Sequence, residues 1–266
     1  MEDEVEKRVD AELNRRLSQP RLKDKDLFEV VEEVFDRRTV LGVMELRRRR
    51  CIKVLKGVVS AGKEARVYWA KGFSGEDLAV KIYLTVTAEF RKSIWRYIRG
   101  DPRYEWIGKL PRHKLMAVWA RKEFSNLKRM YEAGVEVPQP CCVYQNILVM
   151  RFIGRDGVRA PLLKEAVEHG LLDTSEYEEV FWRIVDNVKK MYRGAGLVHG
   201  DLSEYNVMLW EGRTYIIDVS QAVRLDHPNA HEFLRRDLGN LVRFFGDELG
   251  VSVPTVDELI REVTEE

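Results

Sequence analysis

The sequence lacks the features that mark a membrane protein or a secreted protein. It has no apolar run of about eighteen residues or more, so we expect no transmembrane helix and no membrane partner. The first residues, Met1 to Arg8, are mostly charged, which argues against a secretory signal. Lys and Arg number 45 and Asp and Glu number 44, so only local basic patches could favour nucleic-acid binding. A chain of 266 residues that is 45% hydrophobic can bury the core of one large or two modest domains.

Cysteine and histidine are scarce. The three cysteines, Cys51, Cys141 and Cys142, are an odd number and two of them are adjacent, which makes a poor disulfide framework. This pattern suits a reducing compartment, and we therefore expect a cytoplasmic protein. His227 and His231 stand four residues apart but have no clear third ligand, so no zinc site is expected.

The most informative stretch runs from Leu197 to Asp218. An apolar lead-in reaches a His-Gly-Asp turn, an asparagine follows five residues after the acid, and a short hairpin brings a second acid behind two isoleucines. We expect Asp201 to be the catalytic acid or base and His199 to orient its loop. We expect Asn206 and Asp218 to be oxygen ligands of magnesium on a polyphosphate. A lone H-G-D is weakly specific, whereas the whole pattern is strongly specific; the alternative is a structural turn capped by Asp201 and Asn206.

A glycine-containing segment at residues 57–64 nearly matches the P-loop pattern G-x4-G-K-[ST]. The match fails because Glu64 stands where a hydroxyl would bind magnesium, and because residues 65–70 alternate as a strand instead of opening a helix. We therefore expect a strand–turn–strand flap over phosphate. Its residues are Ser60, Ala61, Gly62, Lys63 and Glu64. A plain hairpin turn remains the alternative.

A lysine inside an apolar strand also indicates phosphate chemistry. Lys81 lies in the predicted strand 78–83, where an unpaired buried charge would be costly. In kinases a lysine at such a place contacts the phosphates and pairs with a helical glutamate. We expect Glu123, in the middle of the predicted helix 115–131, to be that partner. The alternative is an edge lysine whose ammonium group reaches solvent.

Residues 142–153 predict two strands that lead directly into Gly154. We interpret the end of the second strand as a hinge between a small lobe and a larger helical lobe. Backbone groups there could hydrogen-bond an adenine edge. The hinge residues are Met150, Arg151, Phe152 and Ile153.

Helices are predicted at several other places. The apolar spacing in residues 1–18 and 24–50 predicts two amphipathic helices that pack on the main domain. Pro161 is expected to open a helix at its first position. Asp173 or Thr174 is expected to cap a longer helix that runs to Gly194.

Two further segments leave alternatives open. Arg47 to Arg50 are followed by Lys53 and Lys56, and these six positive charges could contact a phosphate backbone or could form a solvated helix end. Residues 85–110 are rich in charged and aromatic side chains. They could be a loop that orders on a partner such as RNA, or a packed insertion.

At the residues described above, the sequence resembles the RIO family of atypical protein kinases. The resemblance covers roughly residues 50 to 245. Its motifs are S-A-G-K-E-A at 60–65, A-V-K at 79–81, H-G-D-L-S-E-Y-N at 199–206, I-D-V-S-Q at 217–221 and H-P-N-A at 227–230. The type-one subfamily fits best, because of the G-K-E-A flap, the D-V-S-Q loop and the short segment of about fifty residues before the flap.

The resemblance implies an α+β, two-lobed protein-kinase-like fold. It places an N-terminal helical extension at 1–50, a small antiparallel sheet lobe at 51–153 and a reduced, mostly helical lobe at 154–266. It also implies a serine/threonine kinase and ATPase that uses ATP and Mg²⁺, with Mn²⁺ as an alternative ion, and that autophosphorylates on serine. The implied role is maturation of the small ribosomal subunit, whose precursor, with its rRNA and proteins, would be the partner.

The sequence departs from ordinary kinases at Gly200, where an arginine is usual, and at Val219-Ser220, where Phe-Gly is usual. These departures argue against regulation by activation-loop phosphorylation. Forty-eight residues follow Asp218 without an A-P-E motif, which agrees with the implied absence of the usual activation loop and peptide platform. A small-molecule phosphotransferase of the aminoglycoside or choline kinase type shares H-G-D-x4-N, although the small second lobe leaves little room for its substrate pocket. An ATP-binding pseudokinase scaffold is the other alternative, and it is disfavoured because every expected catalytic residue is present.

Overall fold

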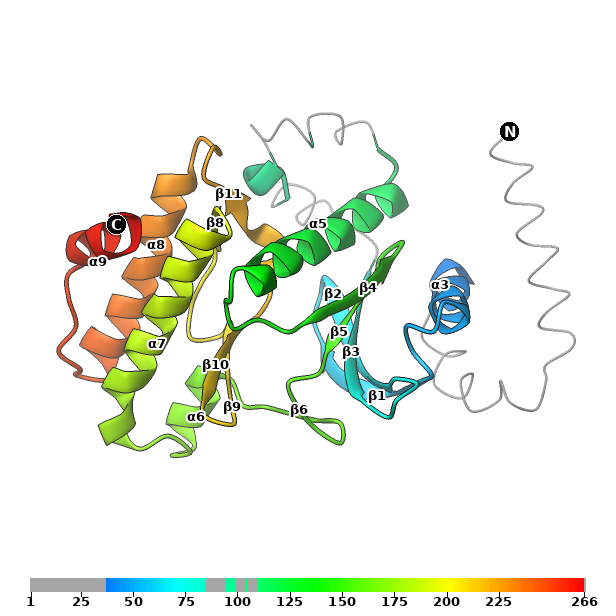
Figure 1. Ribbon diagram of the computed structural model, residues 1–266, viewed down its shortest axis with the longest axis horizontal. Coiled ribbons are helices and arrows are strands. Elements are labelled where there is room, and N and C mark those ends of the chain that lie inside the picture. Colours follow the sequence, from blue (N-terminus) through cyan, green and yellow to red (C-terminus); the bar gives the residue numbers. More distant parts are fainter. Residues whose placement is uncertain (1–36, 85–93, 99–103, 105–109, 266) are drawn as a thin grey trace, which may run out of the picture.

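The computed structural model describes residues 37–84, 94–98, 104 and 110–265, and this part of the chain forms two lobes (Figure 1). One lobe contains a five-stranded antiparallel sheet crossed by a long helix, and the other lobe is mostly helical. The α+β, two-lobed kinase-like fold expected from the sequence is therefore confirmed.

The sheet lobe has a helix on each side of its sheet. Its elements are α3 (Arg37–Arg48), β1 (Val54–Ala61), β2 (Ala65–Lys71), β3 (Asp77–Tyr83), α5 (Arg112–Glu132), β4 (Pro140–Tyr144) and β5 (Ile147–Arg151). The strand order is β1-β2-β3-β5-β4, and all neighbours are antiparallel. β3 lies in the middle of this sheet, which explains why its sequence is an almost continuous apolar run.

The two faces of the sheet pack against different helices because side chains alternate along a strand. Val80 and Ile82 point to the face that α3 covers, where they join Val43 and Leu46 in one cluster. Tyr83 and its neighbours on the opposite face join the larger cluster, which α5 shares with the helical lobe. Lys81 has the same parity as Tyr83, so the alternation directs it toward α5 and the second lobe.

The helical lobe consists of short strands at the lobe interface and helices behind them. Its strands are β6 (Gly154–Arg155), β7 (Val158–Arg159), β8 (Leu197–Val198), β9 (Val207–Trp210), β10 (Arg213–Ile216) and β11 (Val223–Arg224). Its helices are α6 (Leu163–Glu168), α7 (Tyr177–Lys189), α8 (Ala230–Val242) and α9 (Val256–Thr264), with 3-10 turns η2 (Thr174–Glu176) and η4 (Val219–Gln221) and π turns η3 (Lys190–Gly194) and η5 (Arg243–Glu248). Apolar side chains of α7 and α8 form the centre of this lobe, and the ring centroids of Phe181 and Phe245 lie 5.3 Å apart there.

Several predicted helices begin or end elsewhere. The predicted helix 1–18 and the first part of the helix 24–50 lie outside the described residues, and the described part is α3. Pro161 does not open a helix: its carbonyl accepts from the N–H of Leu209 at 3.0 Å, so the chain stays extended and α6 begins at Leu163. Asp173 is a cap as predicted, but it caps the short turn η2, and α7 follows.

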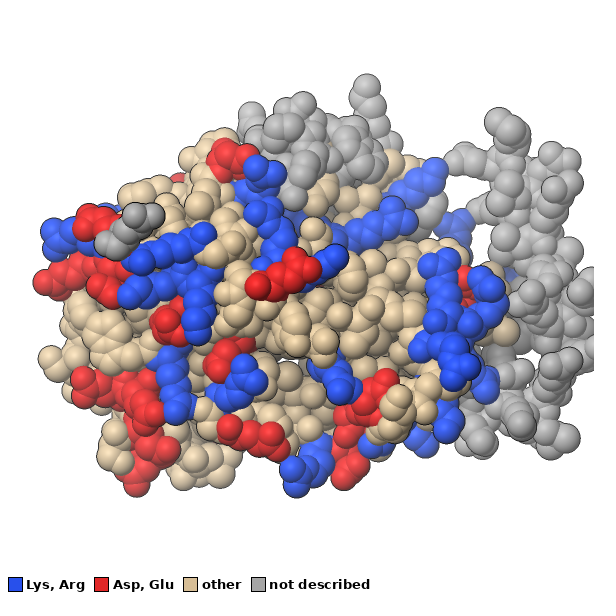
Figure 2. Space-filling model, viewed as in Figure 1, with Lys and Arg blue, Asp and Glu red and all other residues tan. Residues whose placement is uncertain are grey.

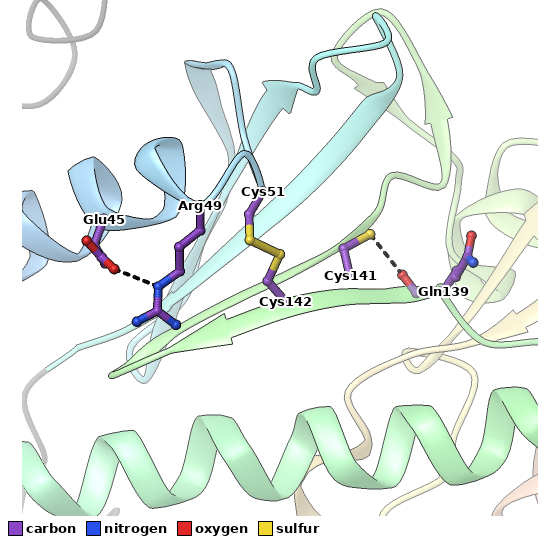
Figure 3. Close-up of a disulfide and its surroundings, with 6 residues drawn as sticks. All are labelled: Glu45, Arg49, Cys51, Gln139, Cys141 and Cys142. Atoms are coloured by element: carbon purple, nitrogen blue, oxygen red, sulfur yellow. Dashed lines mark hydrogen bonds and ion pairs between the residues drawn. A yellow bond between two sulfur atoms is a disulfide. The ribbon is translucent and has the colours of Figure 1, made fainter.

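The expectation of a poor disulfide framework is wrong, because Cys51 and Cys142 form a disulfide (Figure 3). Cys51 lies in the turn after α3, and Cys142 lies on the edge strand β4, where α3 packs. The adjacent cysteine, Cys141, points away and donates its S–H to the carbonyl of Gln139. A separation of 91 residues hides this pairing in the sequence, and only the packing of α3 on the sheet reveals it.

The basic segment after α3 forms an exposed surface. Arg48, Arg49, Arg50, Lys53 and Lys56 are exposed, and Figure 2 shows Lys and Arg gathered over the end of α3 and the start of β1. Glu45 pairs with Arg48 at 2.7 Å and with Arg49 at 2.6 Å. The guanidinium groups of Arg49 and Arg50 also stack on aromatic rings, those of Tyr144 and Phe73. The surface is therefore only partly neutralised, and both alternatives for it stay open.

Among the described residues, no helix combines the length and the apolar character that crossing a membrane requires.

The disulfide leads to a stability prediction. Cys142→Ser should lower the free energy of unfolding by about 2–4 kcal/mol, because the bond closes a long loop in the unfolded chain. Urea unfolding of the oxidised protein, followed by circular dichroism, measures this change. Cys141→Ser is the matched control and should change the stability by less than about 0.5 kcal/mol. Equal unfolding midpoints for wild type and Cys142→Ser under oxidising conditions would contradict the assignment.

Candidate active site

Lys81 of β3 lies between two carboxylates. Its Nζ is 2.9 Å from Oε1 of Glu123 on α5 and 2.7 Å from Oδ1 of Asp218, which follows β10. Glu123 is therefore the partner of Lys81, as predicted. The edge-lysine alternative fails because β3 is a central strand and only 10% of the Lys81 side chain is exposed.

The charges of Lys81, Glu123 and Asp218 shift one another's pKa values. Burial opposes the ammonium form, but Asp218 and Glu123 outweigh it and raise the pKa of Lys81 well above its usual value. Lys81 in turn holds the pKa of Asp218 below its usual value. Burial raises the pKa of Glu123, while Lys81 opposes this rise.

Tyr83 also contacts this group, although the sequence did not single it out. It lies two residues after Lys81 on the same face of β3, and its hydroxyl donates to Oε2 of Glu123. Burial raises the pKa of Tyr83 well above its usual value, so the phenol keeps the proton that it donates. Both carboxylate oxygens of Glu123 are thus bound by β3. The sequence feature that could have identified Tyr83 is its spacing of two residues from Lys81, which places both side chains on the same face of a strand.

The loop from His199 to Asn206 connects β8 to β9. Burial lowers the pKa of His199, so its ring is neutral at pH 7. Its Nε2 lies 3.0 Å from the carbonyl oxygen of Ile217 and donates to it, while its Nδ1 accepts from the N–H of Asp201 at 3.2 Å. His199 therefore ties the loop to the segment that carries Asp218, which agrees with the orienting role expected from the sequence.

Helix α8 holds the same loop from behind. The carboxylate of Asp237 accepts from the N–H of Gly200 at 2.7 Å and from the N–H of Leu202 at 2.9 Å. The Nδ2 of Asn240 donates to the carbonyl of Leu202 at 2.8 Å, and Arg236 donates to the carbonyl of Gly200. The backbone on both sides of Asp201 is thus held by α8. The sequence feature that could have identified Asp237 is its place, as an acidic residue, within the apolar stripe of a helix.

Holding the loop with the buried carboxylate of Asp237 is energetically unfavourable for the ionised side chain. Burial raises its pKa to about 7, although the two N–H donors favour the ionised form. Gly200 has a φ of 80°, a left-handed conformation that suits glycine and not the arginine usual in kinases.

The ring of Tyr97, in the helical segment 94–98, lies 5.4 Å from the ring of Phe233 on α8. Residues 94–98 are thus packed, whereas most of 85–110 lies outside the described residues.

Asp201 and Asn206 lie at the two ends of this loop's turn. The Nδ2 of Asn206 donates to the backbone carbonyl of Asp201 at 2.7 Å, which directs the amide oxygen of Asn206 away from that carbonyl. Asp201 is exposed, yet partial loss of hydration raises the pKa of its carboxyl, and Asp218 adds to this rise while Arg236 opposes it. A raised pKa suits a carboxylate that takes up a proton.

These donors fit a magnesium ion. Asp218 offers a carboxylate whose side chain is 54% exposed, and Asn206 offers an amide oxygen. Mg²⁺ takes few protein oxygens and keeps its remaining positions for water and phosphate. Within the described part of the chain, no three His, Cys, Asp or Glu side chains cluster closely enough to hold a metal ion.

The flap has the strand–turn–strand form expected from the sequence. β1 ends at Ala61, β2 begins at Ala65, and the N–H of Gly62 donates to the carbonyl of Ala65 at 3.0 Å. Ser60 and Lys63 are exposed. Loss of hydration raises the pKa of Glu64, and the charges of Asp218 and Asp201 raise it further while Lys81 opposes this rise.

The expected hinge is only partly available. The N–H of Arg151 donates to the carbonyl of Gln139 at 2.8 Å, and the N–H of Phe152 donates to the carbonyl of Asp77 at 3.1 Å. The carbonyl of Ile153 accepts from the N–H of Ala160 at 2.9 Å. Met150 pairs with Ala79 within the sheet. The prediction that the whole stretch offers backbone groups to adenine is therefore too broad, because the sheet uses several of them.

Comparison with known proteins identifies the family to which the chain is similar. The model of the RIO domain matches residues 66–259. The chain is 42% identical over 264 residues to the serine/threonine-protein kinase RIO1 of Caenorhabditis elegans, covering 98% of this chain and 50% of that protein. It is 42% identical over 225 residues to the RIO-type serine/threonine-protein kinase Rio1 of Haloferax volcanii, covering 85% of this chain and 74% of that protein. The chain thus spans about half the length of the C. elegans relative.

The fold is also similar to a solved structure. The Rio2 kinase-ADP/Mg²⁺-phosphoaspartate complex from Chaetomium thermophilum aligns with a TM-score of 0.64 over 86% of this chain and 67% of that chain. Its sequence identity is 21%, so the likeness concerns the fold alone. Because the family model covers most of the chain and relatives share 42% of its residues, the chain belongs to the RIO family.

Proposed function

We propose that the chain is an ATP-dependent serine/threonine protein kinase of the RIO type that also hydrolyses ATP. The observation that carries this proposal is the buried group in which Lys81 lies between Glu123 and Asp218. It supplies a fixed cation for phosphates and a carboxylate for a metal, beside the loop of Asp201. The names of the curated relatives, serine/threonine-protein kinases, support the same activity.

In this proposal each residue has one task. Lys81 binds phosphate oxygens, and Glu123 and Tyr83 hold Lys81 in place. Asn206 and Asp218 would hold Mg²⁺, or Mn²⁺ in its place, which would supply positive charge to offset that of the phosphates. Asp201 takes the proton of the attacking serine hydroxyl, or of water in the ATPase reaction. Its raised pKa brings it nearer to the range in which a carboxylate is an effective base.

The flap and the hinge complete the nucleotide site. We assign phosphate contacts to the backbone of Ser60, Ala61 and Gly62, with Lys63 and Glu64 beside them. At the hinge, the N–H groups of Arg151 and Phe152 already have partners, so we assign the adenine contact to the N–H of Ile153. The small-molecule kinase alternative finds no specific support in the structure, and the pseudokinase alternative does not explain why all the charged residues are assembled.

The proposed acid/base role of Asp201 can be tested by substitution. Asp201→Asn should lower phosphoryl transfer and ATP turnover at least about 100-fold, because the side chain can no longer accept a proton. Transfer of label from γ-phosphate-labelled ATP, to the protein itself and to a protein substrate, measures the change. Asp218→Asn should cause a loss of similar size. Asp226→Asn, at an exposed acid, is the control and should retain wild-type rates. Undiminished turnover in Asp201→Asn would refute the assignment.

The ion pair leads to another prediction. Glu123→Gln should raise the KM for ATP about tenfold, because Lys81 loses one of the two charges that hold it, while glutamine can still accept from Tyr83. Steady-state kinetics over a range of ATP concentrations measures KM and kcat separately. Glu132→Gln, on the same helix but exposed, is the matched control. An unchanged KM in Glu123→Gln would show that the pair does not position Lys81.

We further propose that the protein acts in the cytoplasm on a precursor of the small ribosomal subunit and that it autophosphorylates on serine. The family resemblance supports this partner. The protein should cosediment with small-subunit precursors in a sucrose gradient and should detach when ATP is added. ATP turnover measured with and without purified small subunits tests the same idea. Lack of association, together with faster turnover on adding free aminoglycosides or choline, would favour a small-molecule kinase instead.

A further inference from the structure

Helix α5 carries three buried polar side chains. Lys122, Glu123 and Asn126 are each no more than 2% exposed. Lys122 and Asn126 are four positions apart and share a helix face, whereas Glu123 is adjacent to Lys122 and points in a different direction. A buried polar group is costly unless it has hydrogen-bond partners. Glu123 has Lys81 and Tyr83 as partners, and the other two residues bind elsewhere.

Lys122 and Asn126 both bind the backbone that follows Asp218. The Nζ of Lys122 donates to the carbonyls of Ser220 at 2.7 Å and Ala222 at 2.5 Å. The Nδ2 of Asn126 donates to the carbonyls of Val219 at 2.9 Å and Ala222 at 3.2 Å. The carbonyls of Val219, Ser220 and Ala222 are thus bound to α5. The positive charge of Lys122 lies at the end of the short turn η4, where carbonyl oxygens gather.

This contact matters because the backbone of Asp218 is held in an uncommon conformation. Asp218 has φ 62° and ψ 48°, in the left-handed region that non-glycine residues seldom adopt. On the preceding side, the N–H of Ile217 donates to the carbonyl of Asn206 at 3.0 Å, and its carbonyl accepts from His199. On the following side, the bonds are those from α5. The direction of the Asp218 carboxylate therefore depends on both anchors.

We propose that Lys122 and Asn126 are positioning residues that set the direction of the Asp218 carboxylate for the metal ion. This inference rests on the proposed function, in which Asp218 holds Mg²⁺. One helix then positions Lys81, through Glu123, and the metal-binding carboxylate, through Lys122 and Asn126. The loop that follows Asp218 is buried, with Val219 at 0% and Ser220 at 4% exposure. The loop and α5 therefore move together, which removes the independent movement that would turn Asp218 away from the nucleotide.

The test is the Mg²⁺ dependence of nucleotide binding, measured on the full chain with a fluorescent ATP analogue. Lys122→Met and Asn126→Leu should each raise the Mg²⁺ concentration for half-maximal binding about tenfold. Affinity without Mg²⁺ should stay within about twofold of wild type, because Lys81 and Glu123 remain paired. Lys122→Arg keeps a donor and a positive charge and should restore most of the Mg²⁺ affinity. Lys128→Met, at an exposed lysine of the same helix, is the matched control.

Thermal unfolding of each variant separates positioning from stability. Asn126→Leu keeps the number and branching of the side-chain heavy atoms, and it tests the proposal even where Lys122→Met does not fold. Folded variants that are less stable but have the wild-type Mg²⁺ requirement would overturn the inference and leave only a structural role. Failure of the proposed function has a different signature: wild-type protein itself would bind nucleotide without any Mg²⁺ dependence and would transfer no phosphate, and the inference would fall with it.

Discussion

The site depends on two ion pairs of Lys81, one with Glu123 within the sheet lobe and one with Asp218 of the helical lobe. Lys81 and Glu123 are both buried, so removing one partner of this pair leaves an uncompensated charge, at a cost of about 3–5 kcal/mol. The strand β3, the helix α5 and the segment after β10 therefore have to meet in one arrangement. Tyr83 contributes by binding the second oxygen of Glu123. The same charges that constrain the fold are the ones that a nucleotide and its metal would use.

Buried polar contacts hold the two loops around these charges. Asp237 binds the backbone on both sides of Asp201, and His199 binds the segment before Asp218. Each of these groups is desolvated, and burial favours its neutral form. It therefore raises the pKa of Asp237 and lowers the pKa of His199. Such contacts make weak contributions to net stability, but they restrict the loops to one geometry, which electrostatic catalysis requires.

Local patterns were sufficient where chemistry and secondary structure share a short stretch. The flap, the strand of Lys81 and the loop from His199 to Asn206 were predicted because their residue types and spacing lie within a few residues of one another. The pairing of Lys81 with Glu123 was also predictable, since a buried cation on a strand needs a helical acid. The hinge was predicted too broadly, because which amides remain available depends on β-sheet partners such as Gln139 and Asp77. The start of α6 was misplaced because Pro161 pairs with β9.

The sequence by itself determined the family, the two-lobed class and the identity of the charged residues, because these follow from patterns that are local along the chain. Only the tertiary structure decided which distant groups meet. It joined Cys51 to Cys142, placed Asp237 behind the loop of Asp201, and brought Lys122 and Asn126 to the carbonyls after Asp218. These contacts join residues dozens of positions apart, and the physical reason for each is the packing of one element on another: α3 on β4, α8 on the loop from His199 to Asn206, and α5 on η4.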